Sequence, residues 1–180
     1  MPSIREPAVS DAICTSCEHA SIHVVAPPTA MPEFASKRAA LAAQAAADLY
    51  DEGYFCGESV LRVVNELAPE PLPPAFMRLG TGFCEGMGGA GCTCGALAGA
   101  IMSMGLFAGR ESLADPWEPS FFPSGALHDK FRSAFKASCC RTIVRPFGGM
   151  EGEGRHAHCA VVTGAAAGWV VEIAETNGWL

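Results

Sequence analysis

Nine cysteines are spread over the 180 residues of the chain. A thiolate can bind a metal, hold an iron–sulfur centre or attack a disulfide, whereas a buried cysteine can also serve as a small apolar residue. The N-terminal residues mix charges with prolines and lack the apolar run of a secretory signal, which predicts a cytoplasmic protein in which disulfides are uncommon. We therefore expect metal, cluster or redox use of the cysteines rather than a disulfide scaffold.

The segments that position these cysteines have helical periodicity and no convincing strand alternation. Five helices are predicted, at about residues 33–53, 55–67, 95–109, 126–144 and 157–175. A glycine-rich loop is expected at 86–91 and a turn-rich connection at 110–125. The predicted fold is all-α, a single-domain bundle formed by residues 33–180, preceded by an irregular, proline-interrupted leader at 1–32.

The first predicted helix is expected to bury one apolar face. Leu41, Ala45 and Leu49, together with Phe34, recur near helical spacing along it. We expect these side chains to face the core.

Three of the cysteines fall at predicted helix starts, namely Cys56, Cys94 and Cys159. Unpaired backbone N–H groups and the helix dipole favour thiolate over thiol at such a position. Converging helix ends would also donate hydrogen bonds to the sulfur ligands of a metal or cluster.

Charge and composition exclude some partners. The net charge is −7 and no basic run is present, so nucleic acid is not expected to bind. Residues 86–109 carry no charge, but their glycines and the lack of flanking aromatic or basic anchors favour a buried helix over a membrane span.

Several segments together resemble a known family, the redox-active proteins named for the pattern C_GCAxxG_C_C, which are similar to the split-Soret cytochromes c. The resemblance covers roughly residues 38–175 and depends on EGYFCGESVL, on GTGFCEGMGGAGCTCGALAGAIMSMGLFAGR, on CCR and on HCAVV. It implies a helical fold and a redox role, and the split-Soret relatives suggest an iron–sulfur centre. The family cysteines fall on Cys56, Cys94, Cys140 and Cys159, which are the predicted cofactor and metal ligands.

The remaining cysteines are candidate alternates: Cys14, Cys17, Cys84, Cys92 and Cys139. Cys14 and Cys17 form a CxxC, but Glu18 stands where covalent haem attachment requires histidine, so no covalent haem is expected. His156 and His158 precede Cys159 closely and could add nitrogen ligands, although a solvated helix start is the simpler interpretation. His128 has no predicted catalytic partner.

Three functions remain open from these residues. The first is electron transfer through a cysteine-ligated iron–sulfur centre, with a redox partner protein that the sequence does not identify. The second is a thiol–disulfide oxidoreductase, and the third is a non-catalytic structural zinc protein. Self-association into a homodimer is also expected, because the apolar helices at 95–109 and 157–175 offer more apolar surface than a small bundle covers.

Overall fold

The structure, a computed structural model, describes residues 28–180. Within these residues it contains seven α-helices, two 3-10 helices and no β-strand. The one strand-like contact among them is an isolated antiparallel bridge between Thr93 and Cys139. The predicted all-α class is thus confirmed for this part of the chain, while Cys14, Cys17 and most of the predicted leader lie outside the described residues.

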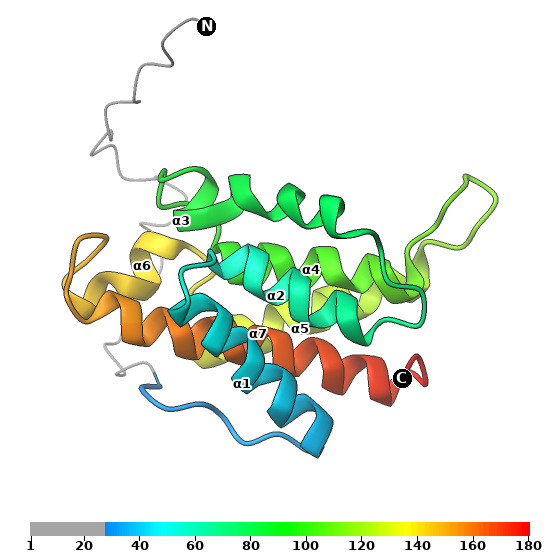
Figure 1. Ribbon diagram of the computed structural model, residues 1–180, viewed down its shortest axis with the longest axis horizontal. Coiled ribbons are helices and arrows are strands. Elements are labelled where there is room, and N and C mark those ends of the chain that lie inside the picture. The colour runs from blue at the N-terminus through cyan, green and yellow to red at the C-terminus, as the bar shows by residue number, and fades with distance from the viewer. Residues whose placement is uncertain (1–27) are drawn as a thin grey trace, which may run out of the picture.

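The long helices lie side by side, with α3 and α6 at one end of the assembly and the connection 109–117 at the other (Figure 1). In chain order the elements are α1 (Lys37–Asp51), α2 (Cys56–Leu67), η2 (Pro74–Phe83), α3 (Cys84–Met87), α4 (Gly95–Ala108), α5 (Glu118–Phe135), α6 (Cys140–Val144), η3 (Arg145–Phe147) and α7 (Arg155–Thr176).

The prediction of about five helices misses α3 and α6, which are four and five residues long. Helices this short carry less than two turns of periodicity, so no apolar repeat reveals them. The five long helices correspond to the five predicted segments, with shifted ends.

Helix α1 packs along α7 through small residues. The Ser36 hydroxyl caps α1 by accepting the Ala39 N–H at 3.0 Å. The fully buried side chains of the helix are alanines. Of the predicted apolar face, Phe34 and Leu49 pack partly buried against the core, whereas Leu41 is 61% exposed, so the prediction was wrong at Leu41. The reason is the close approach of α7, since a Cβ at Gly164 would lie 2.6 Å from the Ala43 carbonyl oxygen; alanine fits such a contact and leucine does not.

Helix α5 differs from its prediction at both ends. It begins at Glu118, inside the expected turn-rich connection, because proline is tolerated in a first turn and the helix also accommodates Pro123. It ends at Phe135, where Lys136 adopts a left-handed conformation with φ of 62°. The predicted continuation to residue 144 is instead the separate helix α6.

Helix α7 occupies the centre of the core. It has 22 residues and is apolar enough to span a membrane by length and composition alone, but 67% of its most apolar window is buried inside the structure. Its apolar side chains pack with those of α1, α2, α4, α5 and α6 in a contiguous core. Burial against protein accounts for the composition of this helix.

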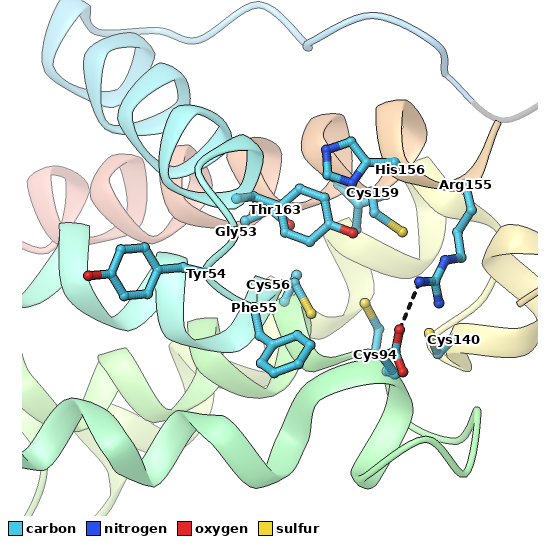
Figure 2. Close-up of a pocket in the computed structure, with 14 residues that line it drawn as sticks. Gly53, Tyr54, Phe55, Cys56, Cys94, Cys140, Arg155, His156, Cys159 and Thr163 are labelled. Carbon is cyan, nitrogen blue, oxygen red and sulfur yellow. Dashed lines mark hydrogen bonds and ion pairs between the residues drawn. The ribbon is translucent and has the colours of Figure 1, made fainter. Parts of the chain in front are cut away.

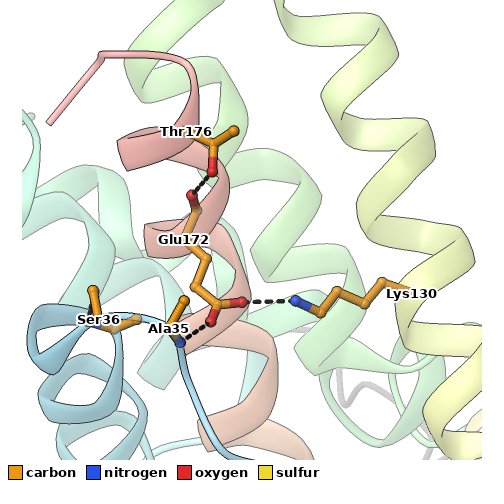
Figure 3. A network of polar contacts seen from close by, with 6 residues as sticks. Ala35, Ser36, Lys130, Glu172 and Thr176 are labelled. Carbon is orange, nitrogen blue, oxygen red and sulfur yellow. Dashed lines mark hydrogen bonds and ion pairs between the residues drawn. The ribbon is translucent and has the colours of Figure 1, made fainter.

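A polar contact on α7 connects it to two other segments (Figure 3). The Glu172 carboxylate accepts the Ala35 N–H at 2.6 Å and pairs with Lys130 of α5 at 2.7 Å. Nearby, Met31 packs against Gly164, although residue 31 falls within the predicted leader. The segment before α1 is therefore attached to the helices from at least Met31 onward.

Candidate functional site

Four cysteines from four different helices line one cavity of about 210 Å³. Cys56 is the first residue of α2, Cys94 precedes α4, Cys140 is the first residue of α6 and Cys159 lies on α7. Figure 2 shows their sulfur atoms around the same space. The structure thus brings together the four cysteines that the family pattern selects.

The alternate cysteines take other positions. Cys84 is buried behind Cys56 and does not line the cavity. Cys92 and Cys139 do not line it either, and the Cys139 thiol donates to the Gly91 carbonyl oxygen at 3.2 Å. Cys14 and Cys17 lie outside the described residues.

Hydrogen-bond donors surround the sulfur of Cys56. The Cys84 thiol and the backbone N–H groups of Gly57, Glu85 and Ala96 face it, and of these the Cys84 thiol lowers its pKa most. Together they lower the pKa of the Cys56 thiol below its ordinary value, although burial acts in the opposite direction. The pKa of Cys56 is thus shifted in the predicted direction, with the Cys84 thiol as a larger cause than the N–H groups at the helix start.

The glycines of the CGALAG block allow this arrangement. A Cβ on Gly95 would lie 2.7 Å from the Cys56 Sγ, and a Cβ on Gly99 would lie 2.6 Å from the Gly57 carbonyl oxygen. Both distances are shorter than a side chain tolerates, so α2 and α4 can cross this closely only because the two positions lack a side chain. The crossing places the Ala96 N–H of α4 against the sulfur at the start of α2.

The pKa values of the other three cavity thiols are raised. Burial, followed by the charges of Cys56 and Cys140, raises the pKa of Cys94 even though it stands at the start of α4. Burial is also the main cause that raises the pKa of Cys140 to about 12 and that of Cys159 to about 11. The expectation of a thiolate at Cys94 and Cys159 is therefore wrong for the metal-free protein, because desolvation outweighs the helix-end donors. Cys159 also lies one turn inside α7, which begins at Arg155.

Polar side chains that the sequence did not indicate complete the cavity wall. The Tyr50 hydroxyl hydrogen-bonds to Cys159, and burial followed by the nearby Cys159 and Cys56 charges raises the pKa of Tyr50. Arg155 Nη2 pairs with Glu85 Oε1 at 2.7 Å. A lone tyrosine or an ion pair between residues 85 and 155 follows no local pattern, so only the fold reveals them.

The two histidines beside Cys159 have different surroundings. His156 lines the cavity, stacks on Tyr50 with ring centroids 4.8 Å apart and pairs with Asp51 at 2.9 Å. His158 is buried away from the cavity, where its ring stacks on Phe147 at 4.0 Å. His128 lines a separate groove between α4 and α5. Of the three, only His156 borders the four cysteines.

The cavity does not contain a compact site for a single ion. Among residues 28–180, no three His, Cys, Asp or Glu side chains are grouped so that they could hold one metal ion. A zinc ion is held tetrahedrally, with Zn–S distances of about 2.3 Å, and so requires its ligands close together. The described residues therefore offer no preformed structural zinc site.

Comparison with known proteins identifies a family whose matched region includes the four cavity cysteines. Neither the curated proteins nor the solved structures gave a match. A family model described as "Putative redox-active protein (C_GCAxxG_C_C)" matches residues 54–173, two thirds of the chain. The match spans all four cavity cysteines and the glycines that bring Cys56 against α4. The predicted resemblance is thereby confirmed, and the chain belongs to the C_GCAxxG_C_C family of redox-active proteins.

Proposed function

We propose that the protein transfers electrons through an iron–sulfur centre held by Cys56, Cys94, Cys140 and Cys159. The observation that carries the proposal is the convergence of these four thiols, from four helices, on one cavity. Cysteine thiolates are the usual ligands of such centres, and four of them complete a cluster. When bound, the centre would supply one-electron redox chemistry.

The residues around the cavity suit this group better than a single ion. The thiols are spread around a space of about 210 Å³ rather than gathered at one point. A cluster contains several irons and sulfides of its own, so its thiolate ligands stand farther apart than the ligands of one zinc ion. This difference favours the cluster over the structural zinc site.

The chain's own groups would tune such a centre. Backbone N–H groups of Gly57, Glu85 and Ala96 donate to the Cys56 sulfur, and the Tyr50 hydroxyl donates to Cys159. Hydrogen bonds to sulfur ligands stabilise the more negative, reduced state and raise the reduction potential. The Arg155 guanidinium lies on the same wall, where its charge is balanced by the paired Glu85 carboxylate.

The second candidate function, thiol–disulfide oxidoreductase, also has a specific observation in its favour. Cys56 borders the cavity and is the thiol there whose pKa is lowered, as an attacking thiolate requires. In that function, the protein would reduce a disulfide substrate and hold no iron.

Metal analysis of the full chain, purified and reconstituted without oxygen, tests the proposal. We expect bound iron and acid-labile sulfide, with visible absorption from sulfur-to-iron charge transfer. Serine at any one of the four cavity cysteines should remove most of the iron, because three ligands leave an open and labile position. The matched controls Cys92→Ser and Cys139→Ser should retain it, since neither residue lines the cavity.

Each function predicts its own result. Iron lost equally from cavity and control variants would overturn the ligand set. Iron absent from the wild-type chain, together with disulfide reduction that depends on Cys56, would favour the oxidoreductase. Circular dichroism of each variant separates loss of ligand from loss of fold.

A further inference from the structure

Thr163 is a polar residue of the cavity wall that none of the four cysteines explains. It lies on α7, one turn after Cys159, and both residues line the cavity (Figure 2). Arg155, His156 and Val162 line it from the same helix, at the spacing of one helix face. The Thr163 side chain is 0% exposed, so this face of α7 carries a fully buried hydroxyl at the site.

The Thr163 hydroxyl has no hydrogen-bond partner among residues 28–180. A buried serine or threonine inside a helix commonly donates to the carbonyl oxygen four residues earlier. Ser59 and Ser103, the two other hydroxyl residues at 0% exposure in the described part of the chain, do so at 3.0 Å and 2.8 Å. Thr163 makes no such bond to the Cys159 carbonyl oxygen, so its proton is not used within the helix.

A buried hydroxyl without a partner is unfavourable, because folding removes it from water and returns no hydrogen bond. The charged neighbours on the same wall are already paired. Arg155 binds Glu85 at 2.7 Å, and His156 binds Asp51 at 2.9 Å. The acceptor that suits Thr163 is therefore a group bound in the cavity rather than a neighbouring side chain.

The chemistry of the cavity indicates what that acceptor is. The other wall-lining groups that carry no hydrogen-bonded or charged oxygen or nitrogen partner are the four thiols, and a centre held by them presents sulfur. Thiolate and sulfide sulfurs carry negative charge and accept hydrogen bonds, whereas a hydroxyl can donate one. Cys159 attaches the centre to the same face of α7 that carries Thr163.

We infer that Thr163 is a further contact residue of the site, whose hydroxyl donates a hydrogen bond to a sulfur of the centre that the four cysteines hold. The inference rests on the proposed function and deepens it, because hydrogen bonds to sulfur are one means by which a protein sets the reduction potential of a cluster. Reduction by one electron adds negative charge to the sulfurs, so the hydrogen bond becomes stronger and the potential is raised.

The first part of the test uses the full chain, reduced and free of metal. Thr163→Val removes the hydroxyl and keeps the branched shape of the side chain, whereas Thr163→Ser keeps the hydroxyl. Because the hydroxyl has no partner in the protein itself, Thr163→Val should unfold at the same or a higher urea concentration than wild type. Circular dichroism measures the unfolding. A clearly lower concentration would show that the hydroxyl is already hydrogen-bonded, and would overturn the inference.

The second part uses the same chains reconstituted with iron and sulfide without oxygen. Thr163→Val should bind as much iron as wild type, since all four cysteines remain, but its midpoint potential should be more negative. Thr163→Ser should restore the wild-type potential. Ser103→Ala is the matched control and should leave the potential unchanged, because it removes a buried hydroxyl that lies off the cavity and has its own partner.

Other results would overturn the inference. A wild-type potential in Thr163→Val would do so, as would a shift that Thr163→Ser shares, because that shift would come from side-chain packing and not from the hydroxyl. Iron lost from both variants would also overturn it, whereas iron lost from Thr163→Val alone would support the contact through affinity. A wild-type chain that binds no iron would overturn the proposed function and this inference with it. An unchanged potential in an iron-loaded Thr163→Val chain would overturn this inference alone.

Discussion

Helix α4 has a hollow near each end, and the two differ in size and in chemistry. The cavity at its N-terminal end is about 210 Å³, whereas the groove that α4 forms with α5 farther along is about 590 Å³. The smaller hollow holds four thiols, an ion pair and a tyrosine hydroxyl. The larger one has mostly apolar surface, to which Ile101, Trp117 and Phe121 contribute, and no cysteine among its lining residues. The proposed function therefore rests on the convergence of donor groups in the smaller hollow and not on volume.

The glycines of α4 explain the difference. Gly95 and Gly99 are in tight contact with α2, but a Cβ on Gly105 would meet nothing within 4 Å. The close crossing at the N-terminal end brings backbone N–H groups to a sulfur. Farther along the helix, Gly105 is exposed and lines the groove, while the neighbouring Met104 is fully buried in the core.

Substitution of a tightly packed α4 glycine has the largest expected effect on stability. It would test directly whether the two ends of α4 differ in packing. Gly99→Ala should lower the free energy of unfolding by about 1–3 kcal/mol, because its Cβ would meet the backbone oxygen of Gly57. Gly105→Ala is the matched control on the same helix and should raise stability by about 0.5–1 kcal/mol, since alanine suits a helix interior better than glycine. Urea denaturation measures both; equal effects would mean that the two ends of α4 are packed alike.

The second prediction concerns how the free energy of unfolding depends on pH. This dependence should reflect the thiols of the cavity, since the groove has none among its lining residues. The pKa values of Cys140 and Cys159, about 12 and about 11, are above their ordinary value of 9.0. The unfolded chain therefore loses these protons at lower pH than the folded chain, so the stability that they contribute is complete below pH 9 and is lost as the pH rises toward 11 and 12. Cys56 shifts in the opposite direction, so its contribution is lost only as the pH falls through its lowered pKa.

Denaturation of the reduced, metal-free chain at a series of pH values checks this prediction. The free energy of unfolding should fall across the window from about pH 9 to 12, and Cys159→Ser should make the fall shallower. Cys92→Ser, at a position off the cavity, should leave the slope as in wild type. A slope unchanged by Cys159→Ser would contradict the burial of that thiol.

The smallest effect on stability is expected at the groove. Phe121 and Phe122 are 61% and 63% exposed, and Trp117, which packs edge-on against Phe121, is 46% exposed. We predict that this aromatic surface, rather than the largely buried α7, supports the expected self-association. Sedimentation at several concentrations should show association that a Phe121→Ser, Phe122→Ser double variant weakens. The variant should keep the iron content of the wild-type chain and change the free energy of unfolding by less than about 0.5 kcal/mol. A wild-type chain that stays monomeric at every concentration would contradict the predicted self-association.

The sequence by itself predicted the helical class and the approximate positions of the long helices, and the resemblance to the family selected four cysteines that line one cavity in the structure. Helix propensity and the prolines that stop helices act over a few residues, so a single segment contains that information. The order Cys56, CGALAG, CCR, HCAVV was specific enough to indicate the family. The two glycines of CGALAG, Gly95 and Gly99, lie where the fold leaves no room for a side chain.

Only the tertiary structure decided what surrounds those cysteines. Tyr50, Glu85 and Arg155 join the cavity, and Cys84 moves from an alternate ligand to a neighbour of Cys56. The same holds for the alanine face of α1, since small side chains are buried there because α7 approaches closely. These features depend on distances between residues far apart in the chain, and on whether burial or hydrogen bonding dominates at each thiol. Neither quantity exists until the helices have packed, so no local pattern could have contained it.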